Sequence, residues 1–273
     1  AYWDENEDEA ERPRGRWWTT DPNGLRLSGK AVIFLGILAL GLGFRLWQID
    51  RLPPDMTWDH TQKLLDVRDV VQHGLRPVFF YRNTGREPLQ FYWTALLIRL
   101  TGLPVGFTVL KLGTALAGVL TLPAVYLMAQ ELYGAAVARW AMFFTAVADW
   151  PVWISRMGLR YPFAPLFSAW SFYFMLRGMR TGRRRDFLML GLCLGAGLYG
   201  YTAFRLVPLA VAFAWLLACA LGDEGDKIFH NLHWTRPALT IITATLVFIP
   251  LGLFMVWDSG AFWGRSAWYL YHN

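Results

Sequence analysis

Residues 51–89, RLPPDMTWDHTQKLLDVRDVVQHGLRPVFFYRNTGREPL, form the longest polar interval between the hydrophobic segments of the chain. The segment carries too many charges to cross a membrane, and it is richer in Trp, Tyr and Phe than a simple linker. Asp59 lies near its centre, and Glu87 lies close to its end. We interpret the segment as a loop on the outer membrane face that carries the functional site, with Asp59 as the principal carboxylate.

The composition around this loop is that of a membrane protein. Of the 273 residues, 55% are hydrophobic and 17% are charged, whereas about 25% of the residues in a soluble domain are charged. The hydrophobic residues come in long runs, which predicts an all-α polytopic membrane protein. The net charge of +6 does not indicate nucleic-acid binding, because basic residues gather at the ends of apolar runs, as the positive-inside rule expects.

The apolar runs predict seven transmembrane helices. Positive charges before the first run place the N-terminus in the cytoplasm, so residues 1–30 are expected to form a flexible cytoplasmic tail. Residues 31–257 are expected to form the seven-helix module, and 258–273 to begin a second outer loop that is truncated here. The individual crossings are expected at 31–49, 106–128, 134–148, 162–176, 187–201, 205–221 and 237–257, with an outer turn at 149–160.

The first part of the outer loop is expected to contain a helix that lies flat on the membrane. Thr57 or Asp59 can cap its start, and apolar residues recur at helical spacing as far as His73. Gly74 then fits a C-cap. Such a helix is too short and too charged to span, so its apolar face should rest on the membrane interface.

Residues 88–103 are the ambiguous stretch. They are largely apolar, but Gln90 and Arg99 interrupt them and the run is short for a crossing. Counting them as a crossing would move the strongest basic cluster, between Arg177 and Arg185, to the outer side, against the positive-inside rule. The outer loop 50–103 is therefore assigned two juxtamembrane helices.

This topology collects acidic and basic side chains on the outer face. Arginine binds phosphate in a fork geometry, and a neighbouring carboxylate can act as a general base, so the set suggests a site for a phosphorylated lipid. Alternatively, the arginines contact lipid head groups or pair structurally with the acids. The members of the set are Asp59, His60, Arg82, Arg86, Glu87, Arg156, Arg160, Tyr161, Tyr201, Arg205 and Arg265. The chain has no metal-type Cys/His spacing.

Four local patterns, in this order and spacing, resemble one enzyme family. They are Asp59 in the first outer loop, a GREP motif at residues 85–88, an SRxGxR turn at 155–160 and a YxAxR turn at 201–205. Together they resemble the membrane glycosyltransferases of the C superfamily, above all bacterial members of glycosyltransferase family 39. This is the protein-mannosyltransferase-like group that includes the aminoarabinose transferases, and the resemblance covers roughly residues 31–273.

The resemblance implies an enzyme that takes a sugar from a polyprenyl-phosphate donor and passes it to a hydroxyl acceptor, usually with inversion. The acceptor is expected to be a protein, glycan or lipid on the outer face of an inner or plasma membrane. The implied general base is Asp59. The implied substrate-binding residues are His60, Arg86, Glu87, Arg156, Arg160, Tyr201 and Arg205. Of these, Arg156, Arg160 and Arg205 are implied to hold the leaving lipid phosphate. No cofactor is required, although some relatives use a divalent cation.

The sequence departs from the family pattern in two ways, and these departures support an alternative function. Many relatives have Glu after the first-loop Asp, whereas His60 stands here and can assist proton transfer or cap the helix. Relatives are also usually longer, with a distal domain that helps to choose the acceptor. The alternative is therefore a catalytically silent structural subunit of a larger membrane protein complex. A transporter would need ionisable residues in mid-helix or paired broken helices, and the sequence shows neither clearly.

Two smaller expectations concern individual residue types. Gly191, Gly195 and Gly197 are expected to permit close helix packing. Most tryptophans fall at predicted interfaces, as an aromatic belt requires, and only Trp58, beside Asp59, is a candidate to stack on a sugar.

Overall fold

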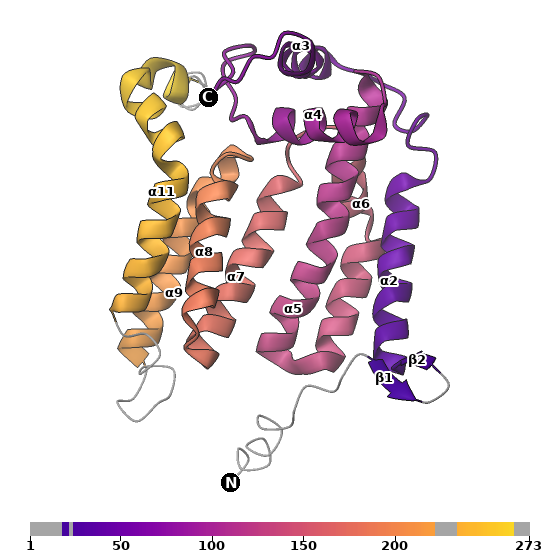
Figure 1. Ribbon diagram of the computed structural model, residues 1–273, viewed down its shortest axis with the longest axis vertical. Helices are drawn as coiled ribbons and strands as arrows, with labels where there is room; N and C mark the ends of the chain where they lie inside the picture. Colours follow the sequence, from indigo (N-terminus) through magenta and orange to yellow (C-terminus); the bar gives the residue numbers. More distant parts are fainter. Residues whose placement is uncertain (1–17, 22–23, 222–233, 265–273) are drawn as a thin grey trace.

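The computed structural model describes residues 18–21, 24–221 and 234–264 of the chain. Long helices stand side by side, and α3 and α4 lie across one end of them (Figure 1). Within the described residues, the only strands are β1 (Trp18–Asp21) and β2 (Gly24–Leu27), an antiparallel pair that begins with Trp18 opposite Leu27. Most of residues 1–30 lie outside the described residues, so the cytoplasmic tail stays a prediction; the architecture is all-α, as predicted.

The first helices account for the first three predicted crossings. Helix α2 (Gly29–Leu46) begins at Ser28, whose Oγ accepts a hydrogen bond from the Ala31 amide at 3.3 Å. Helix α5 (Phe107–Val147) is interrupted at Gly134, which has a φ of 80° and a ψ of 177°. The left-handed φ favours glycine, and the chain turns back there, so α5 supplies two antiparallel arms (Figure 1).

The later helices follow the predicted runs closely. Four described helical stretches are long and apolar enough to cross a membrane: α2, α5, residues 202–220 and α11. The total of seven crossings stays a prediction. One expectation was wrong in part, because the outer turn at 149–160 contains a helix, α6. The elements after α5 are α6 (Asp149–Arg156), α7 (Phe163–Thr181), α8 (Arg184–Gly197), η2 (Thr202–Leu206), α9 (Val207–Leu221) and α11 (Thr235–Trp257).

The two juxtamembrane helices are confirmed. Helix α3 (Trp58–Gln72) and helix α4 (Leu89–Thr101) lie across the ends of the long helices rather than among them (Figure 1). The buried face of α3 presents Val67 and Val70, which join Phe91 and Ala95 of α4 in one apolar cluster. This packing anchors the polar face of α3, and with it Asp59, over the bundle.

Close packing between α8 and α11 depends on small residues, as predicted. A Cβ added to Gly191 would lie 2.7 Å from the Thr240 carbonyl oxygen, and one added to Gly195 would lie 2.8 Å from that of Ala244. Both contacts are closer than real Cβ atoms tolerate, so only glycine lets the two backbones approach. Gly197 instead makes room for the Phe204 ring.

Replacement of Gly195 by valine is therefore expected to destabilise the protein. Overpacking of this kind costs roughly 1–3 kcal/mol, which should appear as a lower melting temperature of the purified protein in detergent. Gly36→Val is the matched control, because Gly36 is also helical and a Cβ there meets nothing within 4 Å. Equal melting temperatures for the two variants would contradict the packing account.

Candidate active site

The start of α3 is fixed by a reciprocal capping arrangement around His60. The Thr57 amide donates to His60 Nδ1 at 3.0 Å, while His60 Nε2 donates to the Met157 carbonyl oxygen at 2.7 Å. Because a carbonyl can only accept, the ring carries its proton on Nε2 and accepts at Nδ1. Burial lowers the pKa of His60, which favours this neutral form. Both ring nitrogens are thus engaged by the fold.

A tight turn brings the GREP motif back onto α3. The backbones of Phe80 and Arg86 exchange two hydrogen bonds of 3.0 and 2.8 Å, and the chain reverses between them. Gly85 has a φ of 83°, and a Cβ there would lie 2.5 Å from the Phe79 ring, so this position requires glycine. Arg82, within the turn, binds Asp66 and Asp69 of α3 at 2.6 Å each and holds the turn in place.

Asp59 lies where this turn meets the first turn of α3. Its Oδ1 accepts hydrogen bonds from Arg86 Nη2 and from Asn83 Nδ2, the latter at 2.6 Å, and its Oδ2 accepts from Lys63 Nζ. Burial raises the pKa of Asp59, but the hydrogen bond and charge of Lys63 and the charge of Arg86 outweigh it, so the pKa lies below its ordinary value. Asp59 is therefore ionised at neutral pH, and 32% of its side chain stays exposed.

Glu87 organises a second, deeper cluster. Its Oε2 accepts from Arg160 Nη1, and its Oε1 accepts from Arg205 Nη2 at 2.9 Å and from Thr202 Oγ1 at 3.4 Å. Only 2% of the Glu87 side chain is exposed. The Arg160 guanidinium also lies 5.8 Å from the centre of the Tyr201 ring. The GREP, SRxGxR and YxAxR motifs thus meet at one carboxylate, although they come from distant parts of the sequence.

Lys63 is, with Asn83, a site residue that the sequence did not single out. It lies one helical turn after Asp59, where i and i+4 side chains meet, and 2% of its side chain is exposed. Burial, then the charge of Arg86 and more weakly that of Arg160, lower the pKa of Lys63, whereas its contact with Asp59 raises it; the resulting pKa is about 7. Arg160, which binds Glu87, thus also acts on the charge of Lys63 beside Asp59.

Arg156 is the predicted site residue that the structure places at the end of α2 rather than at Asp59 or Glu87. Its guanidinium donates to the carbonyl oxygens of Phe44 at 2.6 Å, Trp47 at 2.7 Å and Leu52 at 3.2 Å. These contacts tie α6 to the end of α2. Trp58, the candidate for sugar stacking, is 73% exposed beside Asp59.

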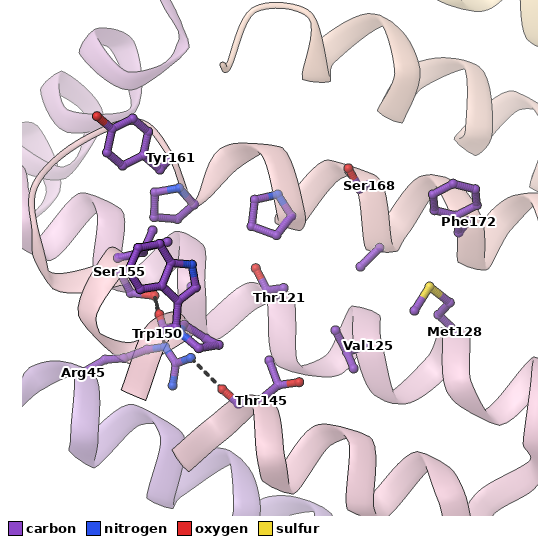
Figure 2. A pocket seen from close by; sticks show the side chains of 16 residues that line it. Arg45, Thr121, Val125, Met128, Thr145, Trp150, Ser155, Tyr161, Ser168 and Phe172 are labelled. Carbon is purple, nitrogen blue, oxygen red and sulfur yellow. Dashed lines mark hydrogen bonds between the residues drawn. The ribbon is translucent and has the colours of Figure 1, made fainter. Parts of the chain in front are cut away.

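An apolar pocket of about 520 Å³ lies between α5, α6 and α7. Arg45, Ser155 and Tyr161 lie toward one end of it, and Met128 and Phe172 lie toward the other (Figure 2). The guanidinium of Arg45 is held by Ser155 and by backbone carbonyls, among them that of Thr145 at 3.0 Å. The Tyr161 ring packs at 5.0 Å on the Tyr201 ring, so one end of the pocket adjoins the Glu87 cluster.

Within the part of the chain that the structure describes, no three His, Cys, Asp or Glu side chains come together as a metal site requires. The carboxylates that approach the site are paired with cations instead.

Sequence comparison identifies a family. The family model for dolichyl-phosphate-mannose-protein mannosyltransferase matches residues 85–257, which include the GREP motif, both later turns and the helices that carry them. Comparison with curated proteins finds no match.

Structural comparison agrees at the level of the fold. The chain is similar to the apo crystal structure of the Archaeoglobus fulgidus oligosaccharyltransferase, with a TM-score of 0.64 and 16% sequence identity. The match covers 81% of this chain but 29% of that one. The chain therefore spans less than a third of the length of that structure.

Proposed function

Because the chain belongs to the dolichyl-phosphate-mannose-protein mannosyltransferase family, a membrane glycosyltransferase family, we propose that it moves a sugar from a polyprenyl-phosphate donor to a hydroxyl acceptor. The reaction takes place at the end of the bundle covered by α3 and α4. This end faces the outside of the inner or plasma membrane, with the N-terminus in the cytoplasm. The observation that carries the proposal is a half-buried, ionised carboxylate, Asp59, beside a buried cluster of cations.

Asp59 is the general base. It is the accessible carboxylate of the site, with 32% of its side chain exposed against 2% for Glu87, so it can reach an incoming hydroxyl. Its lowered pKa keeps it ionised but makes it a weak base. A weak base suffices if the proton moves late, after the hydroxyl oxygen has begun to bond to the sugar and become more acidic.

The net positive charge of the site matches the negative charge of the leaving group. Lys63, Arg86, Arg160 and Arg205 face two carboxylates, which leaves two positive charges when Lys63 is protonated. The donor is a phosphodiester with one negative charge, whereas the departing polyprenyl phosphate approaches a charge of roughly −2. The site therefore stabilises the charge that develops as the sugar–phosphate bond breaks, which is how binding energy lowers a barrier.

The proposed step conserves atoms and charge. The acceptor oxygen forms a bond to the anomeric carbon while the bond from that carbon to the phosphate oxygen breaks. The phosphate leaves with the electron pair, and the acceptor proton goes to Asp59. Base and phosphate lie on opposite faces of the sugar, so the configuration inverts.

The remaining residues have supporting roles. We assign His60 a positioning role, because both of its ring nitrogens hold the start of α3. Arg156 positions α6 against α2 rather than touching the phosphate. The apolar pocket beside Tyr161 offers the lipid chain of the donor a path away from the site.

Lys63 should give donor binding a pH dependence. A lysine is charged below its pKa, so Lys63, with a pKa of about 7, loses its charge as the pH rises through neutrality. The KM for the donor should then rise above pH 7, because the phosphodiester itself does not titrate there. Lys63→Gln should flatten this profile. Lys30→Gln is the control and should keep it, because Lys30 lies at the start of α2. An unchanged profile in Lys63→Gln would remove Lys63 from phosphate binding.

The donor class can be tested directly. Membranes that contain the full chain are supplied with labelled sugar on polyprenyl phosphate, on polyprenyl diphosphate or on a nucleotide. The charge balance predicts transfer from the monophosphate. Transfer from another donor instead would contradict the proposal, and transfer from none would favour the silent-subunit alternative.

A further inference from the structure

A polar pocket lies at the end of the bundle opposite to α3 and α4, where α7 meets α8. It has a volume of about 310 Å³, and the α7–α8 connection lies far from α3 and α4 (Figure 1). Its polar lining consists of Arg177, Arg183, Arg185 and Asp186. Three guanidinium groups against one carboxylate leave two positive charges in the pocket.

One side of the pocket is built in place by hydrogen bonds. Arg177 Nη1 donates to the Tyr173 hydroxyl at 2.8 Å, and Arg177 Nε lies 3.6 Å from Asp186 Oδ1. Asp186 is buried and also accepts from Thr181 Oγ1 at 2.9 Å. Arg177 is therefore oriented before any ligand arrives, which lowers the cost of binding one.

Two further arginines stand exposed at the rim. Neither Arg183 nor Arg185 makes an ion pair with an acid among the described residues. Their guanidinium groups are available for an anion, and arginine prefers phosphate in a forked geometry.

The inner wall of the pocket is apolar. Trp170 stacks on Phe174 with ring centres 5.7 Å apart, and Leu127 and Met189 complete this wall. A hydrophilic anion would gain nothing from such a wall, whereas an amphiphile would bury part of its hydrocarbon there.

We propose that this pocket binds the phosphate group of an anionic phospholipid, with the head group on the arginines and the start of an acyl chain against Trp170 and Phe174. The site is separate from the proposed transfer reaction and does not depend on it. A general excess of positive charge at a helix end would attract anionic lipid too, but it would not distinguish Arg185 from its neighbour Arg184, which is also exposed and does not line the pocket.

This neighbour supplies a matched control. The full chain is reconstituted into phosphatidylcholine vesicles that contain increasing fractions of phosphatidylglycerol, and the phosphatidylglycerol retained on extraction is counted by native mass spectrometry. Arg183→Gln and Arg185→Gln should each weaken retention by roughly tenfold, because each removes a charge-assisted hydrogen bond. Arg184→Gln should retain the lipid like the wild type. Melting temperatures in pure phosphatidylcholine check that the variants are folded.

Two outcomes would overturn the proposal. Equal losses in all three variants would mean that only general surface charge attracts the lipid. If inorganic phosphate alone displaces phosphatidylglycerol, with the same dependence on Arg183 and Arg185, the pocket is a site for free phosphate and not for a lipid. Failure of sugar transfer in the donor experiment would leave this result unchanged.

Discussion

Asp59→Asn is expected to lower sugar transfer by about 10²- to 10⁴-fold, the usual contribution of a general base. The amide is nearly the same size as the carboxylate, and its oxygen can still accept from Arg86 and Asn83. The amide nitrogen of the new asparagine would face Lys63. Without the charge of Asp59, the pKa of Lys63 falls, so Lys63 should become neutral and accept a hydrogen bond from this amide. The fold is therefore expected to survive, and labelled-donor assays on folded protein would measure the loss.

Asp69→Asn is the control for this substitution. Asp69 lies on the same helix and is also paired with an arginine, Arg82, at 2.6 Å, but it does not contact the Asp59 or Glu87 clusters through any described ion pair. Transfer should stay within a few-fold of wild type. A loss equal to that of Asp59→Asn would show that any carboxylate of α3 has the same effect, and Asp59 would then have no special role.

Glu87→Ala is expected to cause the largest loss of stability. The substitution leaves Arg160 and Arg205 without their shared carboxylate, and the Arg160 side chain is 4% exposed. Removal of one partner from a buried ion pair typically costs about 3–5 kcal/mol, because the remaining charge is left uncompensated. Thermal unfolding of the purified protein should show a strongly lowered midpoint, and transfer should be lost with it.

An exposed ion pair gives the matched comparison. Asp50 lies 3.6 Å from Arg51, and both side chains are largely exposed. Asp50→Ala should change the free energy of unfolding by less than about 1 kcal/mol, as exposed pairs do. If Glu87→Ala melts at the same temperature as Asp50→Ala, the Glu87 cluster does not hold the motifs together.

The fold was largely predictable because the membrane imposes length and charge rules. Each later helix begins and ends within a few residues of an apolar run, and the positive-inside rule assigned residues 88–103 to the juxtamembrane helix α4. The end of the crossing at Ala148 was predicted, but the helix α6 that follows it was not. Residues 149–160 read as a polar turn with a proline, and their short helical part was therefore missed.

The site was predictable only in part. Asp59 and Glu87 stood out as acids among arginines, and the i,i+4 spacing from Asp59 could also have indicated Lys63. Asn83 carries no such signal, because its approach to Asp59 depends on the tight turn at Gly85. Arg156 and Arg160 make different contacts because Arg156 is the last residue of α6, and the chain then turns at Gly158, whose φ is 73°.

The most direct test follows a single turnover by the purified full chain with a labelled polyprenyl-phosphate sugar and a hydroxyl acceptor. We expect wild-type protein to release polyprenyl phosphate and form a glycoside in equal amounts, with inverted anomeric configuration, and Asp59→Asn to form both about 10²- to 10⁴-fold more slowly. Wild-type turnover by Asp59→Asn, or a product that retains its configuration, would contradict the assignment of Asp59 as the base that acts opposite the lipid phosphate.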